Sequence, residues 1–233
     1  MIDIHRRHNP RKGVLLIGIA GTGKTTVINN YFAAFDPEKT LASTINFNSF
    51  TDSYALQSVL VGKVEKRMGR IYGPPPGKEL IFFMDDLNMP AVDKYGTQSP
   101  IALIRQIIDY GIVYDRSALE DKMQLIDIQF LACMNPKSGS YKVDLRMSRH
   151  FTQIALTVPE KEILITIYQQ VLANHLKTFD QQNQNWGPKI VSATAVVFSS
   201  LANAPQFWPT ALKFHYQFNM RDFANIIENL LLA

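Results

Sequence analysis

The sequence predicts an α/β fold, in which a largely parallel sheet flanked by helices is followed by an all-helical C-terminal part. Short apolar runs alternate with helical patterns up to about residue 158, an order typical of parallel sheets. A glycine-rich turn at 18–23 separates the first apolar run from the first helical pattern. Beyond Pro159 only helical patterns follow. We therefore expect two subdomains, residues 1–158 and 159–233.

Five apolar runs predict buried strands, at residues 13–17, 43–47, 80–84, 128–134 and 152–158. Helical patterns between them predict helices at 24–35, 53–70 and 101–110, and the basic end of the second suits the helix dipole. Residues 112–114 and 123–126 are expected to pair as a short hairpin, and the Gly/Pro-rich stretch 73–79 to form a rigid loop.

The C-terminal part predicts helices at 160–179, 189–203, 209–217 and 220–232, with a polar linker at 180–188. Together with the preceding sheet, these helices complete the expected architecture.

The composition supports a folded domain. The chain has 233 residues, of which 46% are hydrophobic and 19% charged, so it can bury a core and disorder is not expected. The net charge of +4 is spread out apart from one N-terminal cluster, formed by His5, Arg6, Arg7, Arg11 and Lys12. A solvated N-terminal arm is favoured there over a nucleic-acid patch.

Cysteine content and hydropathy limit the cellular compartments that the sequence predicts. Cys133 is the single cysteine and lies in an apolar run, so we expect a buried core residue, no internal disulfide and a reducing compartment. The N-terminus has no apolar signal-peptide region, and no apolar stretch reaches the length of a membrane span. The abrupt ends predict a piece of a longer polypeptide.

The residues from Gly18 to Thr25 match the phosphate-loop pattern G-x-x-x-x-G-K-[ST] in full. The motif follows a predicted strand and opens a predicted helix, where backbone N–H groups and the helix dipole favour an anion. Lysine contacts the β- and γ-phosphates and the threonine hydroxyl binds Mg²⁺. The expected nucleotide-binding residues are Gly18, Ile19, Ala20, Gly21, Thr22, Gly23, Lys24, Thr25 and Thr26.

Two acids follow the predicted strand at 80–84. An aspartate at such a strand end helps to hold Mg²⁺, and Asp85 fits that role. Asp86 is placed to orient or deprotonate the attacking water. The alternative is a surface turn, where aspartate is common; the phosphate loop about 60 residues upstream makes the metal site the preferred interpretation.

Four further polar residues, in three segments, remain open on local grounds. Asn135 follows the strand at 128–134 and either contacts water and the γ-phosphate or starts an Asn-Pro turn. Arg146 and Arg149 precede the fifth strand, either as an arginine finger for a neighbouring subunit or as surface ion-pair partners. Arg221, at the start of the last helix, either clamps phosphates from above or has no partner.

Taken together, these elements resemble the AAA+ ATPases, and in detail the dynein heavy chain family. The resemblance lies in IFFMDDLNMPAVDKYGTQSPIALIRQIIDYG (81–111), GRIYGPPPGKE (69–79), RMSRHF (146–151) and FNMRDF (218–223). These segments are most similar to the third AAA module of the axonemal, ciliary type. The resemblance covers nearly the whole chain.

The resemblance implies one of six modules in the ring of a microtubule motor, with ATP or ADP and Mg²⁺ as cofactors. Lys24 and Thr25 take the Walker A roles and Asp85 and Asp86 the Walker B roles. Asn135 falls at the first sensor, Arg221 at the second, and Arg149, ahead of Arg146, at the finger. The implied partners are neighbouring modules, microtubules through other parts of the motor, and intermediate and light chains, without nucleic acid or membrane. The implied location is the ciliary or flagellar axoneme, within the cytoskeleton and cytoplasm.

Two departures from the family pattern bear on activity. The second Walker B acid is usually glutamate, so the shorter Asp86 predicts slow, regulatory hydrolysis; the alternative is a structural module that binds nucleotide without turnover. Asn135 lacks the glycine that often precedes it in the family. A nucleic-acid remodeller would need a basic, aromatic pore loop, which we do not find. A small-metabolite kinase is disfavoured only weakly, by the helical C-terminal part.

Overall fold

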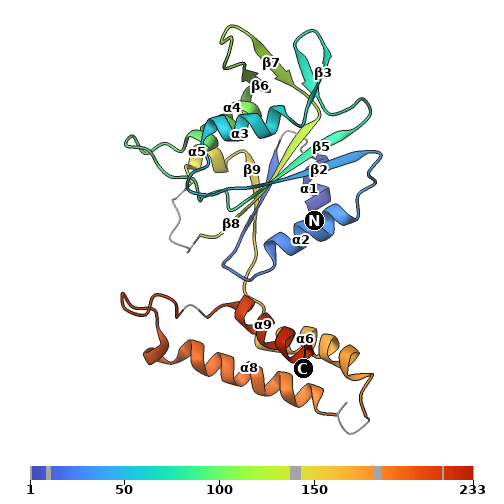
Figure 1. Ribbon diagram of the computed structural model, residues 1–233, viewed down its shortest axis with the longest axis vertical. Coiled ribbons are helices and arrows are strands. Elements are labelled where there is room, and N and C mark those ends of the chain that lie inside the picture. Colours follow the sequence, from blue (N-terminus) through green and yellow to red (C-terminus); the bar gives the residue numbers. More distant parts are fainter. Residues whose placement is uncertain (1, 9–11, 137–142, 181–184, 217, 233) are drawn as a thin grey trace. The chain divides into compact units, whose positions relative to one another are not determined.

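The computed structural model describes residues 2–8, 12–136, 143–180, 185–216 and 218–232. The chain divides into two compact units (Figure 1). The first comprises Met1–Ile19 and Gly23–Leu156, and the second comprises Thr157–Ala233 with the short segment Ala20–Thr22. Each unit has its own hydrophobic core and is described by itself.

A five-stranded sheet forms the centre of the first unit, in the order β2-β5-β8-β1-β9. All neighbouring strands run parallel. The strands are β1 (Gly13–Ile17), β2 (Thr40–Asn46), β5 (Glu79–Asp85), β8 (Ile128–Met134) and β9 (Phe151–Ala155). The five predicted strands are thus confirmed, although β2 begins earlier than expected and β9 ends earlier.

Both faces of this sheet are buried, because helices cover each of them (Figure 1). In β5, Phe82 packs in one cluster with α3 (Ser53–Val61) and α4 (Ser99–Tyr110), while Phe83 packs in the other with α2 (Lys24–Ala33). Strands buried on both faces are continuous apolar runs, which explains why they were recognisable in the sequence.

A second, four-stranded sheet has the order β3-β4-β7-β6, and it corrects one prediction. The helix expected at 53–70 ends at Val61, and Glu65–Met68 forms β3 instead, antiparallel to β4 (Ile71–Gly73). Arg67 of β3 donates to the carbonyl of Pro74 at 2.9 Å and pairs with Asp127 at 2.9 Å. Strand pairing therefore overrides helix propensity here. The predicted hairpin is confirmed, as β6 (Ile112–Tyr114) and β7 (Lys122–Leu125).

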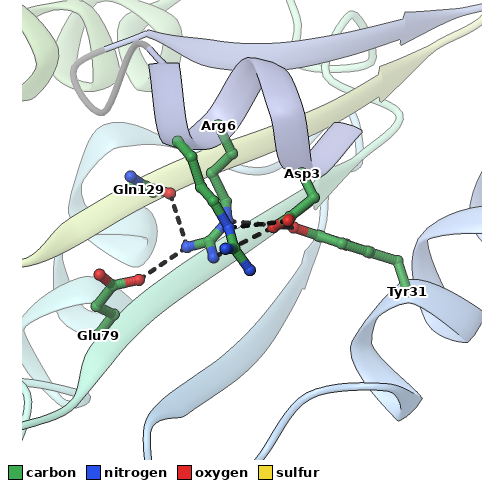
Figure 2. Close-up of polar contacts among 6 residues, drawn as sticks. Asp3, Arg6, Tyr31, Glu79 and Gln129 are labelled. Carbon is green, nitrogen blue, oxygen red and sulfur yellow. Dashed lines mark hydrogen bonds and ion pairs between the residues drawn. The ribbon is translucent and has the colours of Figure 1, made fainter. Parts of the chain in front are cut away.

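The N-terminal segment is a short helix, α1 (Ile2–His8), and its central arginine is buried. Arg6 is only 8% exposed, and Figure 2 shows it reaching across the strand ends. It donates to Glu79 Oε2 at 2.8 Å, Tyr31 Oη at 3.1 Å and Gln129 Oε1 at 3.2 Å. Burial opposes its charge, but the contacts with Glu79 and Tyr31 outweigh that cost and raise the guanidinium pKa. The predicted solvated arm is therefore wrong for Arg6.

The second unit contains α6 (Lys161–Leu176), α8 (Gly187–Asn203), the 3-10 helix η1 (Pro205–Phe207) and α9 (Met220–Leu231). Its core contains Leu172, Val191 and Phe223. The helices predicted at 160–179, 189–203 and 220–232 are confirmed with slightly different ends.

The helix predicted at 209–217 is wrong, because the described residues of that stretch form separate turns, closed by Lys213 N–H to Thr210 and Tyr216 N–H to Lys213. Leu212 is 92% exposed, so no apolar face stabilises a helix there. Residue 217 lies outside the described part. Within the described ranges, no helix is both long and apolar enough to pass through a lipid bilayer.

Candidate functional site

The loops that carry Lys24, Asp85 and Asn135 meet at the carboxyl edge of the five-stranded sheet. Because β1, β5 and β8 are parallel neighbours in this sheet, their C-terminal ends lie at the same edge. The loop at 18–23 follows β1, Asp85 ends β5, and Asn135 follows β8. The amide of Gly18 donates to the carbonyl of Met134 at 3.2 Å, which ties the first loop to the end of β8.

The loop at 18–23 curls because two of its glycines adopt left-handed conformations. Gly21 has φ +81° and Gly23 has φ +78°, a region that costs residues with a Cβ about 1–2 kcal/mol. Gly23 also begins α2, and no described side chain caps this helix. The position that a capping oxygen usually takes is therefore open to an anion at the helix N-terminus.

Lys24 places a positive charge inside this loop. Its side chain is buried, with the residue only 8% exposed, and Nζ donates to the carbonyls of Gly18 at 2.8 Å and Ile19 at 2.9 Å. The carbonyls hold the ammonium on the concave side of the loop. A phosphate oxygen can exchange with these weaker neutral acceptors, so the donor set fits a polyphosphate.

Thr25 and Asp85 meet directly, although they are 60 residues apart in the chain. Thr25 Oγ1 donates to Asp85 Oδ2 at 2.8 Å. The other carboxylate oxygen accepts from the amide of Asp86 at 3.1 Å, which fixes the orientation of the group. A hydroxyl beside a carboxylate fits Mg²⁺, which takes its remaining ligands from phosphates and water. Among the described residues, no cluster of three or more His, Cys, Asp or Glu side chains forms an all-protein metal site.

Asp86 directs its exposed side chain from a strained backbone position. It has φ +54°, the left-handed region that aspartate tolerates better than most residues. The following Leu87 amide donates to the carbonyl of Cys133 at 2.9 Å, so the turn is held against β8. Strain of this kind is typical of functional sites.

Asn135 is buried at the end of β8, and a second asparagine holds its backbone. Asn88 Nδ2 donates to the carbonyl of Asn135 at 2.9 Å, and the two residues are 5% and 8% exposed. This contact links the turn after β5 to the end of β8. Sequence reasoning missed Asn88; its one signal was an amide two residues after Asp86, between the apolar Leu87 and Met89.

Cys133 lies beneath this edge and is not a nucleophile. It is fully buried, as predicted, and burial together with the nearby Asp85 raises the pKa of its thiol to about 12.

Arg146 and Arg149 lie away from the phosphate loop. They are on and directly after α5 (Leu145–Ser148), and both are exposed. Arg149 Nη2 is 3.7 Å from Asp109 Oδ1, and its Nε donates to His150 Nε2 at 3.2 Å. Among the described residues, neither arginine forms a hydrogen bond or ion pair with Lys24, Thr25 or Asp85. Both arginines line a cavity beside α4.

Arg221 belongs to the second unit. It lies in the first turn of α9, where Asn219 and Asp222 form a capping box. Its amide donates to Asn219 Oδ1 at 2.8 Å, and its side chain is on the exposed surface. The capping box thus fixes the start of α9 and places Arg221 in its first turn.

Comparison with known proteins adds to this geometry. Residues 3–159 match the family described as the P-loop containing dynein motor region, and residues 191–233 match the AAA+ lid domain. The chain is 43% identical over 225 residues to dynein axonemal heavy chain 9 of Homo sapiens, which covers 96% of the chain and 5% of that protein. It is similarly 43% identical over 222 residues to the ciliary dynein beta chain of Heliocidaris crassispina (94% and 5%). It is 41% identical over 219 residues to the flagellar outer arm dynein beta chain of Chlamydomonas reinhardtii (94% and 5%). The chain thus spans about 5% of the length of these relatives.

Proposed function

Because the chain belongs to the dynein motor family of AAA+ P-loop proteins, we propose that it is an ATP-binding AAA+ module of an axonemal dynein heavy chain. The proposed module is the third of the ring. It binds ATP or ADP with Mg²⁺ and hydrolyses ATP slowly to regulate the motor. Residues 1–158 form the nucleotide-binding subdomain and residues 159–233 the helical lid subdomain of this proposal.

The observation that carries the proposal is the contact between Thr25 and Asp85. Their side chains approach to 2.8 Å across the edge of the sheet, directly beside the curled loop that holds Lys24. A phosphate-binding lysine, a metal-binding hydroxyl and a metal-binding carboxylate are what a nucleoside triphosphate with Mg²⁺ requires.

In the proposed mechanism, Lys24 leaves its two loop carbonyls and contacts the β- and γ-phosphates. Thr25 and Asp85 would hold Mg²⁺, which would neutralise charge on the phosphate oxygens. Asp86 orients the attacking water and accepts its proton, and Asn135 positions the same water. Hydrolysis is slow, since the carboxylate of Asp86 is one methylene shorter than that of glutamate and a misplacement of about 1 Å costs about a hundredfold.

Two arginines complete the proposed cycle. Arg149, with Arg146 as the second candidate, acts on the nucleotide of the adjacent module, which suits its exposed position beside α4. Arg221 contacts the phosphates from the lid. An isolated chain therefore binds nucleotide but turns over near background, because no neighbour supplies the finger.

The wider assembly is also part of the proposal. The partners are the neighbouring AAA+ modules of the same heavy chain, intermediate and light chains, and microtubules reached through other parts of the motor. The location is the axoneme of cilia or flagella. The names of the relatives, axonemal heavy chain 9 and ciliary beta chain, support this assignment.

A second candidate function is a structural module of the ring that binds nucleotide without hydrolysing it. The aspartate at position 86, in place of a longer acid, favours this alternative. Single-turnover ATP hydrolysis by the Asp86→Asn variant in an assembled ring distinguishes the two functions. If the site is a slow ATPase, the substitution should lower the rate; if the site is non-catalytic, the rate should not change.

Binding of a fluorescent ATP analogue in the presence of Mg²⁺ tests the proposed function. Lys24→Ala should weaken binding about 100-fold, because two charge-assisted contacts of about 1.5 kcal/mol each are lost. Lys39→Ala is the matched control, since the Lys39 side chain is 80% exposed and its one ion pair with a described residue is a surface pair with Asp36. Unchanged affinity in Lys24→Ala, or no binding by the unmodified chain, contradicts the proposal.

A further inference from the structure

Four arginines surround one cavity in the first unit, outside the phosphate loop. The cavity measures about 490 Å³ and lies between α4, α5 and the loop after β6. We call it the four-arginine cavity, after Arg105, Arg116, Arg146 and Arg149. Asp109 is the one acidic residue in its described lining, so four guanidinium groups face a single carboxylate. Arg116, Arg146 and Arg149 are exposed and Arg105 is half-buried, so the cavity opens to solvent and carries an excess of positive charge that an anion can enter.

Arg116 is held in place without a carboxylate partner among the described residues. Its Nε donates to Gln57 Oε1 at 2.8 Å and its Nη2 donates to Ser53 Oγ at 2.8 Å. Its guanidinium also lies over the ring of Tyr54, 5.5 Å from the centroid. Neutral partners orient this guanidinium but leave its charge uncompensated, a preorganised arrangement for binding an anion.

The remaining three arginines share the one carboxylate. Arg149 lies 3.7 Å from Asp109, which also contacts His150 at 3.3 Å. The side chains of Arg105 and Arg146 form no hydrogen bond or ion pair with another described residue. Arg105 is nevertheless half-buried, on the face of α4 that lines the cavity. A partly buried arginine without a carboxylate partner keeps its donors available to an anionic ligand.

The positive charge of the cavity also affects the pKa of the neighbouring His150. Burial lowers the pKa of His150, Asp109 raises it, and Arg149, Arg105 and Lys12 lower it further, with a net decrease. The field of the arginines thus extends through the wall of the cavity, where it disfavours a further cation.

We propose that the four-arginine cavity binds a small polyphosphate anion of the pyrophosphate class, with Arg105 as a principal contact. Planar guanidinium groups match phosphate oxygens in pairs, and several converging groups favour a compact anion with clustered oxygens over a single carboxylate. The site is distinct from the phosphate loop and needs none of its residues. It shares Arg149 with the proposed finger, while the contributions of Arg105 and Arg116 are new.

Calorimetric titration of pyrophosphate into the full chain tests this site. Lys24→Ala is used as the background, so that the phosphate loop no longer contributes. In that background we expect binding with one site per chain at low salt, weakening as salt rises. Adding Arg105→Gln to the Lys24→Ala variant should weaken pyrophosphate binding about tenfold or more, since charge-assisted contacts are lost. Arg70→Gln is the matched control, because Arg70 is exposed, pairs with Asp121 alone in the part of the chain that the structure describes, and lies outside the cavity.

Two arms distinguish the source of the phosphate groups. One-to-one binding by a monomeric chain identifies a free polyphosphate. Self-association of the unmodified chain driven by ATP and lost in Arg105→Gln identifies the nucleotide of a second copy. The proposal is overturned if neither occurs, if Arg105→Gln behaves like Arg70→Gln, or if a hexaglutamate peptide binds the background variant as tightly as pyrophosphate. Because the background lacks Lys24, failure here leaves the phosphate-loop assignment intact.

Discussion

Arg6→Ala is expected to destabilise the first unit, whereas Arg7→Ala on the same helix should have little effect. Arg6 connects α1 to α2 and to the starts of β5 and β8 through three side chains (Figure 2). Arg7 is 73% exposed, and Asp3, at 2.8 Å within the helix, is its one ion-pair partner among the described residues. The two substitutions remove the same charge and side chain from neighbouring positions, so their difference isolates burial and contacts.

The magnitude follows from the contacts of Arg6. The pair with Glu79 is worth about 1 kcal/mol, since that carboxylate is 55% exposed and screened. The hydrogen bonds to Tyr31 and Gln129 add about 1 kcal/mol each. The guanidinium lies 5.7 Å from the ring centroid of Phe35, which contributes about 0.5–1 kcal/mol. Because neighbouring contacts are not additive, we expect a loss of about 2–4 kcal/mol, against about 0–1 kcal/mol for Arg7→Ala.

Hydrogen exchange of the β5 and β8 amides in urea measures this loss in the first unit alone. Both tryptophans, Trp186 and Trp208, belong to the second unit, so their fluorescence should report an unchanged unfolding midpoint and serves as an internal control. Equal protection in the Arg6→Ala and Arg7→Ala variants would refute the argument that α1 is anchored through Arg6. If Arg6→Ala lowered the hydrogen-exchange protection of α1 alone and left the β5 and β8 amides protected, that result would also refute the argument.

Three further predictions concern single positions. Asp86→Glu should speed single-turnover ATP hydrolysis in an assembled ring while leaving nucleotide affinity nearly unchanged; an unaltered rate would show that carboxylate reach does not limit the site. Cys133 should resist a thiol reagent at pH 8 in the folded chain and react after unfolding, since its pKa of about 12 keeps it protonated; rapid labelling of the folded chain would contradict its burial. Gly111→Ala should cost about 1–2 kcal/mol in urea denaturation, since φ is +66° at this end of α4, and Gly111→Asn should cost less; equal losses would argue against backbone strain as the cause.

The phosphate loop and the strand that ends at Asp85 were predictable because their signals are local. Glycine at 21 and 23 permits the left-handed turn, and a lysine and threonine at the start of the following helix need no distant partner to be recognised. Buried parallel strands are short apolar runs, so β1, β5 and β8 were visible for the same reason.

Apart from the helix wrongly expected at 209–217, the features that the sequence did not predict depend on partners distant in the sequence. Residues 65–68 form a strand because β4 and Asp127 hold them there, and the charged pattern alone resembles a helix end. Arg6 looks like a solvated charge until Glu79 and Gln129 approach it from two strands. Asn88 acquires its role only because β5 and β8 are neighbours in the sheet.

The order of residues along the chain thus sufficed to predict a phosphate loop and the two acids that follow β5, since backbone freedom, charge and helix polarity are properties of a short segment. Which groups face one another was decided by the packing of the sheet and its helices. That packing sets Thr25 against Asp85, buries Arg6, and gathers Arg105, Arg116 and Arg149 around one cavity. These contacts join positions tens of residues apart, and the energies that select them are summed over a whole core.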